Sequence, residues 1–303
     1  MRIMTSSRRP TIGVFDSGVG GLTVLRALLH HIPDADYLYF GDTARLPYGS
    51  KSASTVAHYA VGAVHHLQTQ GAELLVIACN TATALAFEEI RAASNVGVIG
   101  VVEPGAEAAA SASRNRKVVV IGTEATVSSH AYRRALEARN VAVKEKACPL
   151  FVPLVEEGWT NHPVTEQVAR IYLEEAFSPE LSVRNSTDHG SADPNSVDRN
   201  PPESDARDAD VLVLGCTHYP LLKPLLGRVA PRHVTIVDSA ESTAMAVAAQ
   251  LQAHPLPASA QIERRSTPRL KFFATDSAEK FKKMGTRFLG LPVDDVLHVD
   301  LRE

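Results

Sequence analysis

The chain is poor in the residues that staple small or secreted folds. Three of its 303 residues are cysteine, one is tryptophan, and the aromatic content is 6%. The cysteines, at positions 79, 148 and 216, are odd in number and widely spaced, which argues against a disulfide framework and against a CxxC metal or redox site. We therefore expect all three to act as thiols.

An excess of positive charge and long apolar runs are also missing. The net charge is −3, so the sequence supplies no general basic field for nucleic acid or anionic lipid. No stretch approaches the roughly 18 apolar residues of a membrane-spanning helix, and the start, MRIMTSSRRP, is not followed by the apolar region of a signal peptide. These absences predict a cytoplasmic protein that binds neither nucleic acid nor membranes.

Several common cofactor and hydrolase signatures are absent as well. The glycine run at 18–21 lacks the third glycine of GxGxxG, and the sequence contains no GxxxxGK[ST], HExxH or GxSxG motif. Lys51 is the one lysine near a predicted site turn, which is weak support for a Schiff base with pyridoxal phosphate. We expect no metal and no organic cofactor.

Short apolar runs, rich in β-branched residues, alternate with helical patterns along the chain. The strands are expected at 11–15, 36–40, 73–78, 96–101, 117–122, 141–145, 210–215, 234–238, 270–274 and 296–300, and the helices include 20–31, 52–70, 82–94, 103–113, 125–139 and 163–177. Near-continuous apolar strands separated by helices are typical of parallel sheets covered on both faces. The length, at roughly 100–200 residues per domain, fits two such domains, so the predicted class is α/β with doubly wound, mainly parallel sheets.

Two stretches of the chain match each other. LLVIACNTATALA (74–86) and VLVLGCTHYPLLK (211–223) share a strand, a cysteine, a threonine and a following helix. The interval from Thr123 to Cys216 is longer than that from Asp16 to Cys79 by the length of a polar tract at 178–207. We therefore predict two pseudo-symmetric halves and treat 178–207 as a disordered surface insertion with too few apolar residues to order it.

The turns after the strands carry the polar residues, and ligands of open α/β sheets bind at that edge. Cys79 and Cys216 each end a buried strand there and can face each other across a ligand. Such a pair suits racemisation, in which one group removes a proton from one face of a stereocentre while the other delivers a proton to the opposite face. Taken singly, each of these residues can also have a purely structural role. Each cysteine can be a small residue of the apolar core, Asp16 can cap a helix, and His218 can be a solvated residue of a turn.

Seven ordered blocks between residues 12 and 222 make the chain resemble the glutamate racemase family of the aspartate/glutamate racemase superfamily. The blocks are IGVFDSGVGGLTVL, YFGDTARLPYGSKS, IACNTATALA, GVVEPGA, IGTEATV, CPLFVPLVEEG and LGCTHYPLL. The resemblance implies cofactor-independent interconversion of L- and D-glutamate for cell-wall peptidoglycan, in a homodimer. It also implies two α/β domains, 1–100 with 223–303 and 101–222, with the active site in the cleft between them.

Roles for individual residues follow from the same resemblance. Cys79 is expected to take the α-proton from D-glutamate with support from Asp16, and Cys216 to take it from L-glutamate with help from His218 and Glu156. The positions that resemble substrate contacts are Asp16, Ser17, Tyr48, Gly49, Asn80, Thr81, Thr123, Thr126, Thr217 and His218. Hydroxyls, amides and N–H groups at helix starts can hold two carboxylates without fixed positive charge.

Two other functions stay open at this point. One is a racemase for aspartate or another acidic amino acid, because a pair of thiols does not measure side-chain length, although the PYGS, CNTA and GCTHYP segments favour glutamate. The other is a catalytically silent protein that binds acidic amino acids. The presence of both Cys79 and Cys216 argues against it, since binding alone needs neither thiol.

Overall fold

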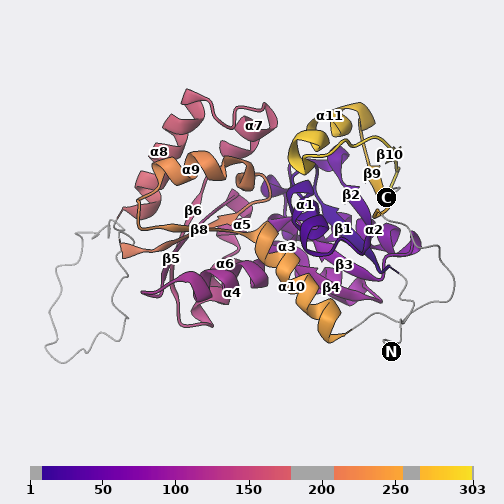
Figure 1. Ribbon diagram of the computed structural model, residues 1–303, viewed down its shortest axis with the longest axis horizontal. Helices are drawn as coiled ribbons and strands as arrows, with labels where there is room; N and C mark the ends of the chain where they lie inside the picture. Colours follow the sequence, from indigo (N-terminus) through magenta and orange to yellow (C-terminus); the bar gives the residue numbers. More distant parts are fainter. Residues whose placement is uncertain (1–8, 179–207, 255–266, 302–303) are drawn as a thin grey trace, which may run out of the picture.

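The computed structural model describes residues 9–178, 208–254 and 267–301, and these ranges contain two parallel sheets (Figure 1). The larger sheet has the order β10-β9-β2-β1-β3-β4 and the smaller one β6-β5-β7-β8, and every strand pair in both is parallel. The strands are β1 (Thr11–Asp16), β2 (Asp36–Gly41), β3 (Leu74–Ile77), β4 (Gly97–Gly100), β5 (Lys117–Gly122), β6 (Ala142–Ala147), β7 (Val211–Gly215), β8 (Thr235–Asp238), β9 (Leu270–Ala274) and β10 (Val296–His298). The α/β class and the parallel sheets are confirmed, and each predicted strand has a counterpart.

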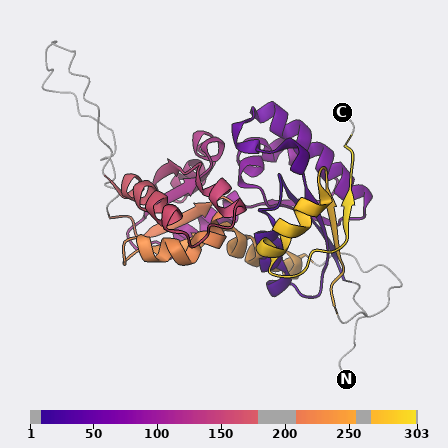
Figure 2. The same ribbon diagram turned by 90° about the horizontal axis from the view of Figure 1, so that it is seen from above.

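The two sheets share one topology. The order β2-β1-β3-β4 in the larger sheet corresponds to β6-β5-β7-β8 in the smaller one, and β9 and β10 extend the larger sheet beyond β2. In this correspondence β3 matches β7, so Cys79 and Cys216 follow equivalent strands. The internal repeat seen in the sequence is therefore also a repeat of the fold. We call the part built on the sheet β10-β9-β2-β1-β3-β4 the larger lobe and the part built on the sheet β6-β5-β7-β8 the smaller lobe (Figure 2).

Helices cover both faces of each sheet. They are α1 (Leu22–His31), α2 (Ala53–Thr69), α3 (Asn80–Ala93), α4 (Val102–Ala112), α5 (Glu124–Ser128), α6 (Ala131–Glu137), α7 (Phe151–Glu156), α8 (Pro163–Phe177), α9 (Lys223–Val229), α10 (Ser239–Ala253) and α11 (Ala278–Leu289). In the larger lobe α1, α10 and α11 pack on one face of the sheet, and α2 and α3 on the other. In the smaller lobe α7, α8 and α9 cover one face, and α4 and α6 the other.

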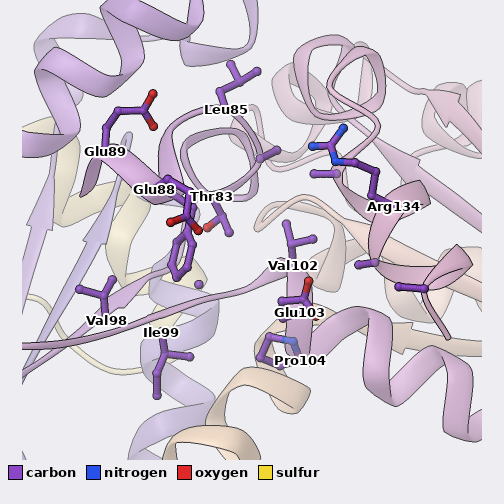
Figure 3. Close-up of a pocket in the computed structure, with 16 residues that line it drawn as sticks. Thr83, Leu85, Glu88, Glu89, Val98, Ile99, Val102, Glu103, Pro104 and Arg134 are labelled. Carbon is purple, nitrogen blue, oxygen red and sulfur yellow. The ribbon is translucent and has the colours of Figure 1, made fainter. Parts of the chain in front are cut away.

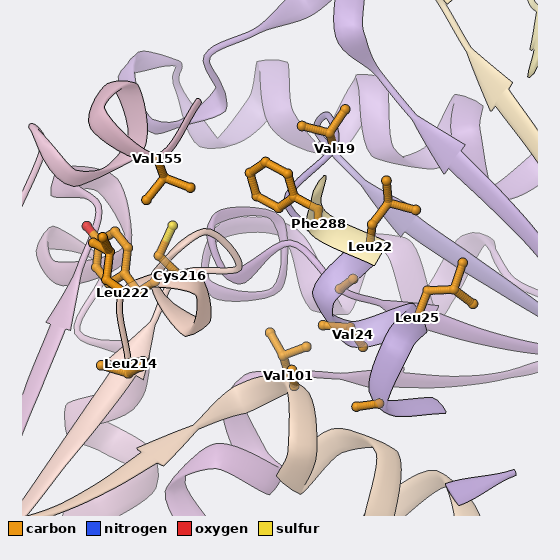
Figure 4. Close-up of a cluster of buried hydrophobic side chains, with 14 of the residues drawn as sticks. Val19, Leu22, Val24, Leu25, Val101, Val155, Leu214, Cys216, Leu222 and Phe288 are labelled. Atoms are coloured by element: carbon orange, nitrogen blue, oxygen red, sulfur yellow. The ribbon is translucent and has the colours of Figure 1, made fainter. Parts of the chain in front are cut away.

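Alternating side chains of the buried strands explain these layers. Along β1, Ile12 and Val14 join the α1 side of the sheet, whereas Phe15 joins the α2 side. Such alternation follows from the pleat, and strands buried on both faces read as continuous apolar runs. One apolar cluster continues across both lobes. In Figure 4, Cys216 and Val155 lie on one side of this cluster and Leu22 on the other, with Phe288 between the two groups.

One predicted helix is interrupted. The expected helix at 125–139 is observed as α5 and α6, and the break lies at His130, which adopts a left-handed conformation with φ of 54°. Apolar periodicity does not specify such a left-handed residue, so the sequence pattern predicts one continuous helix here. His130 pairs there with Glu145 at 2.8 Å.

The boundaries of the domains stay a prediction. The expected division at residue 222 puts all later residues with the first domain, and β9 and β10 do lie in the larger sheet. β8 also follows residue 222 but pairs with β7 in the smaller sheet. The tract 178–207 lies outside the described residues except for Ser178, which follows α8.

No helix in the described ranges combines the length and the apolar character that a bilayer crossing requires.

Candidate active site

A cavity of about 490 Å³ lies where the carboxyl ends of the two sets of strands meet. Cys79, after β3, and Cys216, after β7, both line it, each with 5% of its surface exposed. The predicted residues that line this cavity are Ser17, Tyr48, Gly49, Cys79, Asn80, Thr81, Thr123, Glu156, Cys216, Thr217 and His218. The structure thus brings together residues from six widely separated parts of the sequence around the two thiols.

A second, larger cavity has a different character. Its volume is about 640 Å³, and it is lined by side chains of α3, β4, α4 and α6, among them Glu88 and Arg134 (Figure 3). It contains no cysteine and none of the predicted site residues. The smaller cavity therefore remains the candidate site, because chemistry requires reactive groups and not volume alone.

Cys79 is the N-cap residue of α3. Its sulfur accepts a hydrogen bond from the Ala82 N–H at 3.4 Å, and its thiol donates to the Ser17 hydroxyl at 3.5 Å. Burial, reinforced by the nearby negative charge of Asp16, raises the pKa of the Cys79 thiol to about 12. At neutral pH Cys79 is therefore held as a thiol, and its thiolate, once formed, is a strong base.

Asp16 ends β1 behind Cys79 and is 1% exposed. It does not line the cavity, so the expectation that it touches the substrate has no support in this geometry. Its Oδ2 accepts the Gly18 N–H at 2.9 Å. Burial raises the pKa of Asp16, although the positive charge of His218 and the hydrogen bonds from Gly21 and Gly18 act in the opposite direction.

Cys216 belongs to a chain of three polar side chains. The Nδ1 of His218 lies 3.9 Å from the Cys216 sulfur, and its Nε2 lies 3.1 Å from Oε1 of Glu156. Burial alone lowers the pKa of His218, but its interactions with Cys216 and Glu156 outweigh burial and raise the pKa to about 10. Burial raises the pKa of Glu156, yet the hydrogen bond and charge of His218, with the charge of Lys280, make the net shift downward. At neutral pH the His218 ring is therefore a positively charged imidazolium that lies between the Glu156 carboxylate and the Cys216 sulfur.

Neutral donors form another part of the site. The hydroxyls of Thr81 and Thr123 lie 3.1 Å apart, and that of Thr126 lies 2.9 Å from Thr123 and 3.4 Å from Thr81. Thr123 is also the N-cap of α5, where its hydroxyl accepts the Thr126 N–H. Thr126 is fully buried and lies behind the cavity wall, so it positions the other two hydroxyls and does not face the cavity.

Tyr48 and Asn80 line the cavity but direct polar atoms elsewhere. The Tyr48 hydroxyl donates to Asp42 Oδ2 at 2.6 Å. The Asn80 side chain accepts from the Tyr132 hydroxyl at 2.7 Å and donates to Ser239 at 3.3 Å. Both side chains are therefore fixed before any ligand arrives.

Sequence reasoning missed part of the cavity wall. The additional lining residues are Leu46, Pro47, Ser50, Glu124, Pro149, Val152, Pro153 and Lys280. The first seven lie within or beside the recognisable blocks, and their proximity to the named residues is the signal that could have found them. Lys280 lies in α11, after the last motif, and reaches the site because β9 pairs with β2. No local pattern reveals that long-range pairing.

Cys148 differs from the other two cysteines. It is fully buried, it does not line the cavity, and its thiol lies 3.7 Å from the Lys146 carbonyl oxygen. This placement makes Cys148 a residue of the apolar core.

Comparison with known proteins places this architecture in a family. The model of the family described as Asp/Glu/Hydantoin racemase matches residues 21–176. The chain belongs to this family. Together with similarity to curated racemases over nearly the whole chain, this makes the protein an amino-acid racemase, an isomerase.

The three similar proteins described next are all named glutamate racemase. The chain is 56% identical to a glutamate racemase of Koribacter versatilis, over 98% of this chain and 99% of that protein. Among solved structures, a glutamate racemase isoform of Bacillus anthracis matches with a TM-score of 0.82 and 32% identity, covering 97% of this chain and 98% of the other. The Francisella tularensis glutamate racemase in complex with D-glutamate matches with a TM-score of 0.78 and 31% identity, over 97% and 98% of the two chains.

Proposed function

We propose that this protein interconverts L- and D-glutamate by moving the α-proton between Cys79 and Cys216. The observation that carries the proposal is the position of two thiols at equivalent strand ends on one cavity. In one direction Cys79 removes the α-proton of D-glutamate and Cys216 delivers a proton to the opposite face. In the other direction Cys216 removes the proton of L-glutamate and Cys79 delivers one.

The surroundings of Cys79 suit a base that must attack a weakly acidic C–H bond. A thiol with a pKa near 12 gives a more basic thiolate than an ordinary cysteine, which favours proton removal once the thiolate exists. The Asp16 carboxylate, whose pKa is itself raised, acts on that thiol through its charge. We assign Asp16 to supporting Cys79 and not to binding the substrate.

On the other side, His218 supplies a proton carrier. Its imidazolium is placed to give the Nδ1 proton to the Cys216 thiolate or to take it back. Glu156 holds the other nitrogen and stabilises the charged ring. Cys216, His218 and Glu156 therefore form one acid–base unit.

Glutamate carries two carboxylates, and the cavity offers neutral donors for them. We assign substrate contacts to Ser17, Thr81, Thr123 and Thr217, together with the backbone at Tyr48, Gly49 and Asn80. Donors aimed at the α-carboxylate also stabilise the negative charge that spreads onto it when the proton leaves.

The cellular role follows from the reaction. We propose a cytoplasmic homodimer that uses neither metal nor organic cofactor, binds neither nucleic acid nor membrane, and supplies D-glutamate for peptidoglycan, and so for cell-wall biogenesis and cell shape. The names of the curated relatives support the glutamate reaction alone. The location and the missing nucleic-acid and membrane partners rest on the sequence features described above, and the homodimer and the peptidoglycan role rest on the family resemblance.

The test follows α-proton exchange in deuterated buffer. Purified protein is incubated with L-glutamate, and in parallel with L-aspartate, without pyridoxal phosphate or metal. Loss of optical rotation with α-deuterium incorporation on glutamate alone is the expected result. The same result on aspartate alone would replace the proposed substrate, and exchange on neither substrate by protein shown to bind glutamate would indicate a binding protein.

A further inference from the structure

Helix α11 belongs to the larger lobe, yet it contacts the acid–base unit of the smaller lobe. It follows β9, and it lies beside α7 in Figure 1. α7 ends at Glu156, the carboxylate of that unit. The contact between the two helices therefore joins one lobe to the proton-transfer group of the other.

Arg287 of α11 holds the end of α7 directly. Its Nη1 donates to the Glu156 carbonyl oxygen at 2.9 Å and to the Val155 carbonyl oxygen at 3.4 Å. Carbonyl groups in the last turn of a helix have no partner within the helix, so an external cation is a favourable donor there. These two bonds fix the backbone from which the Glu156 side chain extends.

Gly158 leaves the space that the Arg287 guanidinium occupies. Its φ of +83° is a left-handed conformation, and a Cβ built there would come within 2.8 Å of Arg287 Nη1. The end of α7 and the arginine are therefore fitted to each other, and a side chain at position 158 would displace the guanidinium.

Two further residues of α11 face the same unit. The ring of Phe288 packs edge-on against the His218 ring, with centroids 5.1 Å apart and an interplanar angle of 81°. Lys280 lines the cavity, and its charge acts on Glu156. α11 thus reaches the backbone of Glu156, the carboxylate of Glu156 and the ring of His218.

We propose that Arg287 is a positioning residue for proton transfer at Cys216, acting through Glu156 and His218. The inference rests on the proposed racemisation of glutamate. Arg287 touches neither thiol and does not line the cavity. Its loss lets the end of α7 shift, which misplaces Glu156 against His218 and slows the step in which Cys216 takes or gives a proton.

The decisive measurement is the primary deuterium isotope effect in each direction. The substrates are L- and D-glutamate deuterated at the α-carbon, used with the full chain and with its Arg287→Ala variant. Because the two enantiomers are equally stable, kcat/KM must fall by the same factor in both directions, on the order of ten- to a hundredfold for a misplaced catalytic group. The isotope effect, however, must change unequally: it rises for the enantiomer whose deuteron Cys216 removes and falls for the other.

Reference variants make the result independent of which thiol serves which enantiomer. Glu156→Gln weakens the acid–base unit itself, so Arg287→Ala must shift the two isotope effects in the same directions as Glu156→Gln does. Arg287→Lys, which retains the charge, is expected to recover part of kcat/KM. Lys283→Ala is the matched control, because Lys283 is an exposed cation on the same helix that does not line the cavity, and it should leave both isotope effects and kcat/KM unchanged.

Other outcomes overturn the proposal. Isotope effects that stay at the values of the unsubstituted protein in both directions, with a lower melting temperature, would reduce Arg287 to a structural residue. An unchanged kcat/KM, or a shift opposite to that of Glu156→Gln, would remove it from the Cys216 step. Failure of the proposed function is a separate result, since the unsubstituted protein would then fail to racemise glutamate.

Discussion

The two thiols occupy equivalent places in a repeated fold but have opposite surroundings. Cys79 lies beside a hydroxyl and the negative charge of Asp16, whereas Cys216 lies beside the positive charge of His218. The repeat places the two sulfurs on one cavity. The residues next to each strand end set the protonation states of the groups beside each sulfur. The two halves thus share a backbone plan and differ in electrostatics, and the proposed mechanism uses this difference to act on two mirror-image substrates.

Replacement of either reactive thiol should have the largest effect on this pair. We expect Cys79→Ser and Cys216→Ser each to lower kcat/KM for racemisation on the order of 10³-fold or more, because an alcohol is a far poorer base than a thiol near neutral pH. Steady-state polarimetry measures the loss, and circular dichroism checks the fold. Cys148→Ser is the control and should stay active. Near-normal turnover by either of the first two variants would refute the two-thiol mechanism.

The charge on His218 can be tested through stability. Its pKa in the folded protein, about 10, lies above the ordinary value of 6.5, so the stabilisation from its ion pair is fully present below pH 6.5 and is lost as the pH rises through about 10. We expect the free energy of unfolding of the unsubstituted protein to fall across this range more steeply than that of His218→Gln. Urea titrations at several pH values give this free energy. If it depended on pH with the same slope in both proteins, His218 would not be held as a cation.

The contact between the halves can be broken at a glycine. A Cβ at Gly20 would come within 2.3 Å of the Thr217 hydroxyl and 2.5 Å of His218 Nδ1. Gly20→Ala should therefore cost about 1–3 kcal/mol of unfolding free energy and displace the Cys216 side of the cavity. Gly227→Ala is the matched control, since nothing lies within 4 Å of its built Cβ in helix α9. That control should stabilise by roughly 0.5–1 kcal/mol, and equal effects of the two substitutions would contradict the close contact at Gly20.

The smallest effect is expected where the two halves differ in length. Removal of 178–207 with a short linker should leave kcat/KM unchanged, because no site residue lies in that tract. Size-exclusion chromatography must show that the shortened chain assembles as the full chain does. Loss of turnover in a folded, correctly assembled variant would show that the tract acts on the site.

Local pattern was enough to place some features of this molecule. Cys79 and Cys216 could be placed at the ends of buried strands because the apolar runs and the polar turns after them are contiguous in sequence. The same reasoning located Thr123 and Ser17 on the cavity wall. The family resemblance pointed to Glu156, which the surrounding run FVPLV alone does not separate from Glu157.

Other features depend on contacts between distant segments. Lys280, Arg287 and Phe288 reach the site because β9 adds to the larger sheet next to β2, and nothing in the local sequence of α11 specifies that neighbour. Asp16, predicted both to support Cys79 and to contact the substrate, ends β1 with 1% of its surface exposed and is not among the residues that line the cavity. The left-handed residue that divides 125–139 is likewise a backbone conformation that apolar periodicity does not encode.

The apolar cluster that runs through both lobes has a consequence for folding. Leu22 and Val101 share this cluster with Leu214 and Cys216, so the core on one face of each sheet continues into the other lobe, whereas the core on the opposite face of each sheet lies within its own lobe (Figure 4). The halves of the repeat are therefore expected to melt in one cooperative calorimetric transition, because separating them would expose the shared apolar cluster to water. If the two halves arose by duplication, the single ancestral half would have formed a dimer with a second copy of itself. Otherwise the apolar surface that now joins the two halves would have been exposed to water.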